Sequence, residues 1–312
     1  MPMPRGIKIA IIAIPTLTVL AIITLAVVVI VPEVRLTALA LLGRVEQCSF
    51  AQAVNSARTA KDRIQRMEAI RASARLLQSD DRFGLWRTRD GDFWIPKRNP
   101  DTLFYNLAEQ EQDVYGKGAV GVHAGETVLD CGANIGVYTR KALNAGARTV
   151  IAIEPAPENV ESLQRNFARE IETGRVVIQA AGVWNQAGKL PLTVDAGSSA
   201  RNSFVLSFGP AASIVTIPLV TIDSLVDSLA LQRVDFIKMD IEGAEKKAIA
   251  GAANTLARFH PRLAVAMEHL VDDPIAIPAV VDSMKLGYVT ICGPCLDAGA
   301  AARPDVLYFV KP

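Results

Sequence analysis

The stretch TVLDCGANIGVYTR, residues 127–140, decides the fold of this chain. Its first residues are mostly apolar and lead to Asp130, which predicts a buried strand that ends at an acid. Gly132 and Gly136 follow, and glycines at these places let the chain turn tightly and let a ligand approach the backbone. The helix expected after Gly136 presents unpaired N–H groups in its first turn. The stretch therefore predicts a nucleotide-type cofactor site at the end of a strand.

Strand and helix patterns then alternate to the C-terminus. Five mostly apolar segments predict parallel strands, over residues 127–131, 148–154, 175–180, 234–240 and 262–268. Helices are expected over residues 137–145, 158–170, 244–258 and 277–286. This order is typical of an α/β protein with a mostly parallel, doubly wound sheet. Residues 288–292 and 305–311 have no helical pattern between them, which predicts an antiparallel finish. Residues 189–195 and 215–222 predict two added strands around a long loop, residues 197–212, which is either a lid or a surface connection.

Two features precede the first parallel strand. Residues 83–96 alternate around Asp90 and Gly91, which predicts a β-hairpin with its turn at this dipeptide. Residues 101–115 have the pattern of a helix. Both are expected to complete the entry to the core of the catalytic domain, which we place at residues 83–312.

Residues 33–82 predict a helical neck before that domain. Apolar side chains recur there at spacings of three and four, namely Ile64, Met67, Ile70, Ala74 and Leu77. Such a stripe is most simply a face packed on the neighbouring domain. A coiled coil is the alternative, although the stripe spans few heptads.

Residues 9–31 form an uncharged, almost wholly apolar run. A helix of this length crosses ~30 Å of hydrocarbon, so residues 1–32 predict a single-pass membrane anchor. A cleaved signal peptide is the alternative, but the run exceeds the usual apolar region of such peptides. A buried soluble helix fits Pro15 and the many β-branched residues less well. Between residues 33 and 75, eight basic residues oppose four acidic ones, 8 − 4 = +4, which favours a cytoplasmic catalytic domain.

Composition narrows the functional class. The chain has 312 residues, half of them hydrophobic, and a net charge of +1, which predicts one catalytic domain and gives little support for a nucleic-acid substrate. Its four cysteines are too few and scattered for the disulfide framework of a small secreted protein, so a reducing compartment is expected. Cys292 and Cys295 have thioredoxin-like spacing, but they follow a late strand. We interpret them as two loop thiols, with a redox role as the alternative.

The residues after the first two strands indicate which cofactor is bound. Glu154 follows Asp130 by 24 residues, a spacing at which a carboxylate accepts the hydroxyls of a ribose. NAD-dependent enzymes share this feature but prefer G-x-G-x-x-G facing a pyrophosphate. Here Asp130 directly precedes the glycine turn, and a carboxylate disfavours a pyrophosphate but suits a cationic ligand. S-adenosylmethionine carries an ammonium, a sulfonium and a ribose, and it is the cofactor we predict.

Three ordered motifs, DCGANIGVYTR, IAIEPAPENVESLQRNF and DFIKMDIEGAE, together with AMEH at a later strand end, resemble the FkbM family of S-adenosylmethionine-dependent methyltransferases. The resemblance covers about residues 83–312 and implies the seven-stranded class I methyltransferase sheet. It implies that Glu154 holds the ribose and that the turn residues line the methionine and ribose part of the site, namely Asp130, Gly132, Asn134 and Gly136. It also implies methyl transfer to an oxygen, commonly a hydroxyl of a sugar or a natural product.

Side chains at later strand ends are candidates for catalysis. His269 is the best-placed histidine to act as a base on a hydroxyl, although it can instead bond the neighbouring loop backbone. Asp240 and Glu242 are alternatives, as base or as substrate ligands. A plain D-x-E is a weak metal signature, so we predict no metal. Trp184 and Asn185 are predicted to stack on and hydrogen-bond adenine, with core packing as the competing interpretation for Trp184.

The sequence therefore predicts a membrane-anchored O-methyltransferase that acts on a hydroxyl of a sugar, glycolipid or other small molecule. An NAD-dependent dehydrogenase or epimerase is the alternative, and a non-catalytic membrane adaptor is a third. The adaptor predicts loss of cofactor-site residues, whereas Asp130, Gly132, Gly136 and Glu154 are all present.

Overall fold

A computed structural model describes residues 18–23, 26–27, 30–45, 47–195, 200, 202–206 and 213–312. The chain divides into two compact units, one of residues 1–60 with 295–303 and one of residues 61–294 with 304–312. These limits differ from the predicted ones at residues 32 and 82. The helix α3, Phe50–Ser73, runs through the limit between the units.

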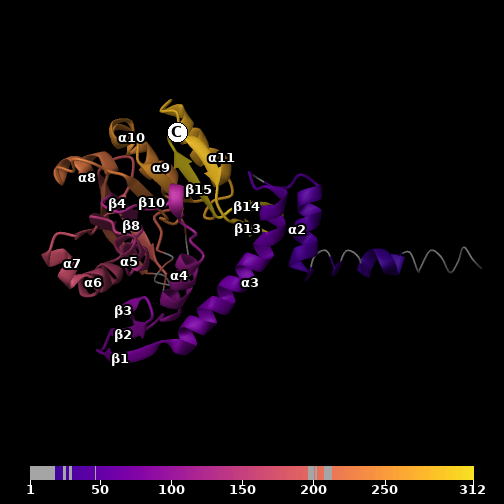
Figure 1. Ribbon diagram of the computed structural model, residues 1–312, viewed down its shortest axis with the longest axis horizontal. Helices are drawn as coiled ribbons and strands as arrows, with labels where there is room; N and C mark the ends of the chain where they lie inside the picture. Colours follow the sequence, from indigo (N-terminus) through magenta and orange to yellow (C-terminus); the bar gives the residue numbers. More distant parts are fainter. Residues whose placement is uncertain are drawn as a thin grey trace, which may run out of the picture. The chain divides into compact units, whose positions relative to one another are not determined.

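A seven-stranded sheet forms the centre of the larger unit (Figure 1), in the order β12-β15-β11-β10-β4-β5-β6. Its strands are β4 (Thr127–Cys131), β5 (Thr149–Ile153), β6 (Val176–Gln179), β10 (Phe236–Met239), β11 (Arg262–Ala266), β12 (Val289–Cys292) and β15 (Val306–Val310). Strands β4, β5, β6, β10 and β11 pair in parallel, and β15 pairs antiparallel to both β11 and β12. The predicted mostly parallel sheet with an antiparallel finish is confirmed.

Helices cover both faces of this sheet because its strands are apolar on both sides. Val128 and Val150 point to the face covered by α5 (Val137–Asn144) and α6 (Pro157–Asn166). Leu129 and Ile151 point to the opposite face. That face is covered by α8 (Ile222–Ser228), α9 (Glu245–Ala250), α10 (Ala253–Phe259) and α11 (Asp273–Ser283). Figure 1 shows the two groups of helices on either side of the strands.

The sheet order positions the site. Strands β4 and β10 are neighbours, and the chain winds from β4 to β5 in one direction and from β10 to β11 in the other. At such a reversal the connecting segments leave in opposite directions, and a crevice opens at the carboxyl ends of the strands. The segments after β4, β5, β10 and β11 meet there.

Two predicted helices are each broken into two. Residues 158–170 form α6 and then α7 (Ala168–Glu172), because Phe167 leaves the helical conformation with φ −124° and buries its ring completely. Residues 244–258 form α9 and α10, separated at Gly251 and Ala252. The predicted helix 101–115 is α4, Asp101–Glu111, which ends earlier, and Asp113 beyond it has φ 53°.

Smaller sheets flank the central one. The predicted hairpin consists of β2 (Phe83–Thr88) and β3 (Gly91–Pro96), with Thr88 paired to Gly91. Its turn is therefore Arg89-Asp90, one residue earlier than predicted. A third strand, β1 (Arg75–Ser79), was not predicted and contains Leu77. The helical stripe thus ends before Leu77, and it packs on the hairpin and α4 through Ile70, Met67 and Ala74.

Strands β7 (Gly182–Val183), β8 (Gly188–Val194) and β9 (Ser213–Val220) form the other flanking sheet. The two strands predicted around residues 189–195 and 215–222 are β8 and β9. The loop predicted between them lies mostly outside the described residues, at 196–199, 201 and 207–212.

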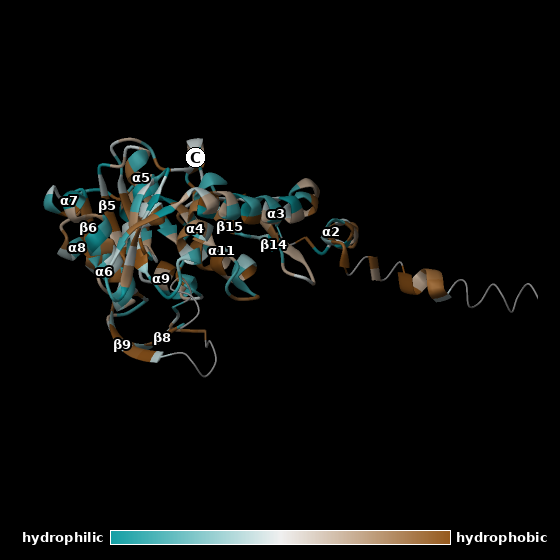
Figure 2. Cartoon of the chain, turned by 90° about the horizontal axis from the view of Figure 1, so that it is seen from below, coloured by the Kyte–Doolittle hydropathy of each residue, from teal (hydrophilic) through white to brown (hydrophobic). Residues whose placement is uncertain are grey.

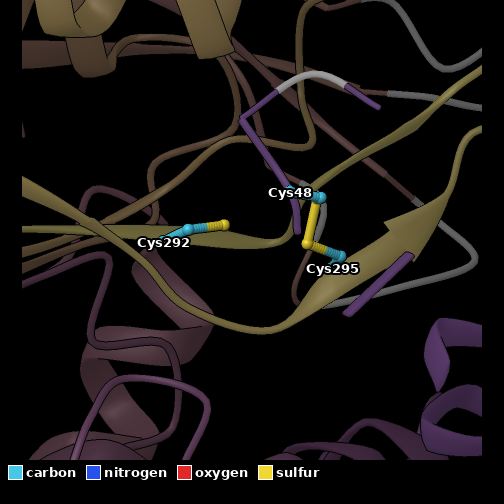
Figure 3. A group of neighbouring side chains, drawn as sticks. All are labelled: Cys48, Cys292 and Cys295. Atoms are coloured by element: carbon cyan, nitrogen blue, oxygen red, sulfur yellow. A yellow bond between two sulfur atoms is a disulfide. The ribbon is translucent and has the colours of Figure 1, made fainter. Parts of the chain in front are cut away.

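The smaller unit contains α2 (Pro32–Leu41), the first part of α3, and the hairpin of β13 (Cys295–Asp297) and β14 (Ala302–Pro304). A disulfide joins Cys48 to Cys295 (Figure 3), and the Arg35 guanidinium pairs with the Asp297 carboxylate. The interpretation of Cys295 as a loop thiol is therefore wrong. The partners are 247 residues apart in the chain, a separation that spacing alone does not reveal.

The predicted membrane anchor falls largely on residues outside the description, namely 9–17, 24–25 and 28–29. Residues 18–23 are helical and exposed, and their apolar character appears in Figure 2 as brown ribbon ahead of α2. Within the described ranges, no helix has the length and apolar character needed to cross a membrane. The anchor stays a prediction.

Candidate functional site

A cavity of about 670 Å³ lies in the larger unit, where the segments after β4, β5, β10 and β11 meet. This volume is within the ~300–1,000 Å³ typical of small-molecule sites. Of the residues predicted for the site, six line the cavity: Gly132, Asn134, Glu154, Asp240, Glu242 and His269. The other four, Asp130, Gly136, Trp184 and Asn185, are not among the described residues that line it.

The turn after β4 is built without side chains at its closest point. Gly132 has φ +78°, and a Cβ there would lie 1.9 Å from the carbonyl oxygen of Asp240. The backbone N–H groups of Gly132 and Ala133 both donate to the carbonyl of Ile153, at 3.0 Å. Only glycine fits this crossing of the β4 and β10 ends, which leaves the backbone exposed to the cavity.

Gly136 serves the packing of the turn rather than the cavity. It has φ +93° and precedes α5, and a Cβ there would lie 2.2 Å from the ring of Phe167. The role predicted for Gly136 in lining the cofactor part is therefore indirect. Because Gly136 has no side chain, the Phe167 ring can pack beside it, and Phe167 is the residue that separates α6 from α7.

Glu154 forms the wall after β5. Its carboxylate accepts hydrogen bonds from the backbone N–H groups of Asn134 and Ala156, both at 2.9 Å, and from the Asn159 amide at 3.2 Å. Burial raises the pKa of Glu154 to about 7, against the opposing effect of these three donors. The side chain is thus held rigidly by the turn, at the position where a ribose contact was predicted.

Asp130, for which a direct ligand contact is predicted, is completely buried and is not among the described residues that line the cavity. Its carboxylate accepts a hydrogen bond from the Thr139 hydroxyl at 2.6 Å and lies 3.5 Å from the Lys238 ammonium. Lys238 also donates to the carbonyl of Gly132 at 2.9 Å. Asp130 therefore positions Lys238, and Lys238 in turn fixes the glycine turn.

Lys238 is a cavity residue that sequence reasoning missed. Its Nζ lies between Asp130 and Asp240, 3.5 Å and 3.6 Å from their carboxylates. Burial would lower the pKa of Lys238, but these two carboxylates raise it above its ordinary value. The available signal was a lysine inside the otherwise apolar strand FIKM, since a buried charge is rare unless it is paired.

Asp240, Glu242 and His269 come together on the opposite wall, and we call them the acid–histidine cluster. His269 Nε2 lies 3.4 Å from Asp240 Oδ1 and 3.7 Å from Glu242 Oε2. The other oxygen of Asp240 accepts a hydrogen bond from the Tyr115 hydroxyl at 2.7 Å. Glu242 has φ 55°, a positive value for a non-glycine residue, and the Ser203 hydroxyl donates to its carbonyl at 2.6 Å.

A buried acid stands behind His269. Its Nδ1 lies 3.1 Å from Glu245 Oε1, which also accepts the backbone N–H of Ile241 at 2.8 Å. Glu245 is fully buried. The sequence pattern assigns no role to this acid at the start of a helix, yet its carboxylate orients the imidazole and points Nε2 at the cavity.

The charged groups of the acid–histidine cluster shift one another's pKa values, including that of His269, the predicted base. Burial would lower the pKa of His269, but the carboxylates of Glu245, Asp240 and Glu242 outweigh it and raise the pKa well above its ordinary value. Burial and the neighbouring acids raise the pKa of Glu242 to about 8 despite His269. The imidazole of His269 is therefore enclosed by three carboxylates, and its role as the base stays a prediction.

The helix α4 supplies a polar wall that sequence reasoning also missed. Its cavity-lining side chains carry hydroxyl, amide and carboxyl groups and belong to Asp101, Thr102, Tyr105, Asn106, Glu109 and Gln110. Arg63 holds this wall through Glu109 at 3.2 Å and Asp305 at 2.9 Å. The other face of α4 is apolar and buried, so its polar face resembles an ordinary solvated surface in the sequence.

Trp184 and Asn185 are not among the described residues that line the cavity. The Trp184 ring packs edge-on against Phe204, with 6.3 Å between ring centroids, and Asn185 is exposed. Their backbone lies against Gly251, where a Cβ would be 2.2 Å from the Trp184 carbonyl oxygen. The cavity instead takes Ala181, Gly182 and Val183 from this segment. The geometry therefore supports the packing interpretation of Trp184.

Comparison with known proteins adds to this geometry. Residues 130–283 match the family model described as the methyltransferase FkbM domain. The hexuronic acid methyltransferase AglP of Haloferax volcanii is 24% identical over 202 residues, which cover 65% of this chain and 73% of the relative. A crystal structure of methyltransferase FkbM from Methylobacillus flagellatus is 20% identical with a TM-score of 0.48, covering 82% of this chain and 60% of that chain. The segment matched to the family contains the glycine turn, Glu154 and the acid–histidine cluster.

Proposed function

The chain belongs to the FkbM family of methyltransferases, and from this premise we propose that it transfers a methyl group from S-adenosylmethionine to a hydroxyl oxygen of a sugar, a glycolipid or another small molecule. The family match favours this function over the NAD-dependent dehydrogenase or epimerase that the sequence left as an alternative.

One observation carries the proposal: a single cavity joins the glycine turn and Glu154 to the acid–histidine cluster. The first part fits the cofactor, because Gly132 exposes backbone and the Glu154 carboxylate can accept the two ribose hydroxyls. The second part fits the acceptor, because its polar side chains converge where an oxygen would meet the methyl group. Bringing the two reactants together at fixed distance supplies much of the rate enhancement of such a transfer.

In the proposed reaction, the acceptor oxygen forms a bond to the methyl carbon while the bond from that carbon to the sulfonium breaks. The sulfur keeps the electron pair of the broken bond and becomes the neutral thioether of S-adenosylhomocysteine. The hydroxyl proton leaves the acceptor oxygen at the acid–histidine cluster and passes to solvent. The cofactor supplies the reactive methyl, and the protein supplies binding, alignment and charge.

The polar wall of α4 supports a polyhydroxylated acceptor. Thr102, Asn106 and Tyr105 offer donors and acceptors along one side of the cavity, and a sugar presents several hydroxyl groups that need such partners. The name of the relative AglP, a hexuronic acid methyltransferase, points to the same class. We therefore infer a sugar, free or carried on a lipid, as the acceptor.

The apolar run of residues 9–31 is the basis for a further part of the proposal, a membrane anchor that holds the enzyme beside a lipid-linked acceptor. A cytoplasmic catalytic domain would have direct access to S-adenosylmethionine, which is made in the cytosol. The Cys48–Cys295 disulfide favours a domain outside the cytoplasm, because disulfides persist mainly in oxidising compartments. Whether the C-terminus is protected from protease in sealed vesicles distinguishes these two sides of the membrane.

The experiment that tests the function has two stages. Calorimetry of the full-length chain should show binding of S-adenosylhomocysteine and none of NAD. Extracts incubated with the enzyme and methyl-labelled S-adenosylmethionine should then yield label in glycan or glycolipid fractions, and Asp240→Asn should abolish it. A methyl ether survives mild alkali whereas a methyl ester does not, so alkali-stable label supports transfer to a hydroxyl. Alkali-labile label, or no binding of S-adenosylhomocysteine, contradicts the proposal.

A further inference from the structure

The acid–histidine cluster has the spacing of ligands around one metal ion. Asp240 Oδ1, Glu242 Oε2 and His269 Nε2 all lie within 4.8 Å of one another, with His269 at 3.4 Å and 3.7 Å from the two acids. Ligands ~2.0–2.2 Å from a shared ion, at angles near 90–110°, lie ~2.8–3.6 Å apart. The two distances from His269 are longer than ordinary N–H···O hydrogen bonds; the distance of 3.4 Å lies within this range and that of 3.7 Å just beyond it.

The atoms that do not face the cavity are already held. Tyr115 donates to the second oxygen of Asp240, which leaves Oδ1 for another partner. Glu245 lies behind His269 Nδ1 at 3.1 Å and is itself fixed by the backbone of Ile241. A carboxylate that orients the far nitrogen of a histidine is the usual outer partner of metal-bound imidazole, because it fixes the ring and raises its basicity.

The charge of the cluster also favours a cation. Asp240, Glu242 and Glu268 line this part of the cavity, and Glu245 stands directly behind. Lys238 is the only lysine among the described residues that line the cavity, and its ammonium already lies between the carboxylates of Asp130 and Asp240. A divalent ion at the three ligand atoms would offset the repulsion between these carboxylates.

We propose that Asp240, Glu242 and His269 bind one divalent cation that holds the acceptor hydroxyl during methyl transfer. Two carboxylate oxygens and one imidazole suit an ion that accepts both ligand types, and Mn²⁺ is the probe that fits them. The inference rests on the proposed function for its role, but its binding site stands on the geometry alone. The sequence predicted no metal because D-x-E is a weak signature, and His269 reaches the site from a different strand.

The cation would act as a Lewis acid on the acceptor. Coordination lowers the pKa of a bound hydroxyl, so its proton leaves to solvent as the oxygen forms its bond to the methyl carbon. The sulfonium takes the electron pair of its broken bond, as before. Such a site needs no protein base, because the bound cation itself makes the hydroxyl more acidic.

Titration of the full-length chain with Mn²⁺, followed by electron paramagnetic resonance, tests the site without any acceptor. We expect one bound Mn²⁺ per chain and, in pulsed spectra, coupling to a ¹⁴N nucleus from His269. His269→Gln should remove this coupling, and Glu242→Gln should weaken Mn²⁺ binding at least about tenfold. Glu245→Gln, which changes only the outer carboxylate, should weaken it by ~10–100-fold. Asp101→Asn, a matched loss of one carboxylate from the same cavity, should change it less than about twofold.

Binding of S-adenosylhomocysteine to each variant serves as the control for folding and separates this inference from the proposed function. If the chain binds S-adenosylhomocysteine but not Mn²⁺, the metal site is wrong and the methyltransferase proposal stands. Mn²⁺ binding that shows no ¹⁴N coupling, or that Glu242→Gln leaves unchanged, also overturns the site. If Mn²⁺ binds as expected and S-adenosylhomocysteine does not, the proposed function fails while the site holds.

Discussion

The two ends of the cavity are built in opposite ways. At the Glu154 end the backbone forms much of the site. Gly132 has no side chain, and the Glu154 carboxylate accepts hydrogen bonds from two backbone N–H groups and one side-chain amide. At the acid–histidine end, charged side chains crowd together at distances longer than good hydrogen bonds. The difference indicates that the first end offers an acceptor already fixed by hydrogen bonds to the turn. The second end holds charge for a partner.

The largest effect should come from the point where the two ends meet. Gly132→Ala places a Cβ 1.9 Å from the Asp240 carbonyl oxygen, so either the turn or the β10 end must move. We expect destabilisation of at least ~3 kcal/mol and loss of cofactor binding, measured by thermal unfolding and calorimetry. Gly125→Ala is the matched control, because Gly125 has φ +81° but open space around its Cβ position. Equal effects of the two substitutions would show that strain, not the crossing, matters.

The second prediction separates chemistry from cofactor binding. Glu242→Gln keeps the shape of the acid–histidine cluster but removes an ionisable carboxyl group from it. Turnover should fall by ~10²-fold or more, while S-adenosylhomocysteine affinity changes less than about twofold. Single-turnover kinetics and calorimetry measure the two quantities. An equal loss in both would mean that the cavity does not divide into the two ends described above.

The third prediction is the reverse case. Glu154→Ala should weaken S-adenosylhomocysteine binding by about 1 to 3 kcal/mol, because the ribose hydroxyls and the donors around Glu154 lose their acceptor. Turnover at saturating cofactor should stay within a few-fold of the parent. Calorimetry provides the measurement, with Glu161→Ala on the outer face of α6 as the control. Unchanged affinity would refute the ribose role.

The pH dependence of cofactor binding sharpens the same assignment. Burial raises the pKa of Glu154 to about 7, so the carboxyl is protonated below this pH and ionised above it. Ribose hydroxyls donate to the ionised form, and affinity should therefore fall as pH falls, by up to about tenfold between pH 8 and pH 6. Calorimetry across this range should find the slope in the parent chain and not in Glu154→Gln. A slope that survives the substitution would assign the titration to another group.

The smallest effect should come from Trp184. Its ring packs on Phe204, which lines the cavity, but Trp184 is not among the described residues that line it, so Trp184→Phe should change S-adenosylhomocysteine affinity less than about twofold. A loss of tenfold or more would restore the adenine contact that the sequence predicted. Fluorescence or calorimetric titration decides between the two outcomes.

The sequence predicted local features well where one segment determines them. The strand 127–131 and the antiparallel finish follow from hydrophobic pattern and from a missing crossover helix, and both are confirmed. The acids at the strand ends were placed at one rim because parallel strands end together. The break at Phe167 was missed because its cause is remote: the ring fills the space that Gly136 leaves empty.

The parts of the site that were missed depend on contacts between distant segments. Asp130 was expected to meet a cationic ligand, but Lys238 from β10 provides the positive charge in its place. Glu245 appears in the sequence as an ordinary acid at a helix start, and only the packing of α9 against the end of β11 places it behind His269. The polar face of α4 has the same pattern as a solvated face, since periodicity shows which residues share a side but not what covers it.

The Cys48–Cys295 bond closes a covalent ring around nearly the whole catalytic sequence, because its two ends are 247 residues apart. A single protease cut anywhere inside this ring leaves one molecule of unchanged mass, and the fragments separate on a gel only after a reductant is added. Protease-cut enzyme from freshly lysed cells, run on a gel without reductant, therefore stays in one band if the disulfide is formed in the compartment where the enzyme works.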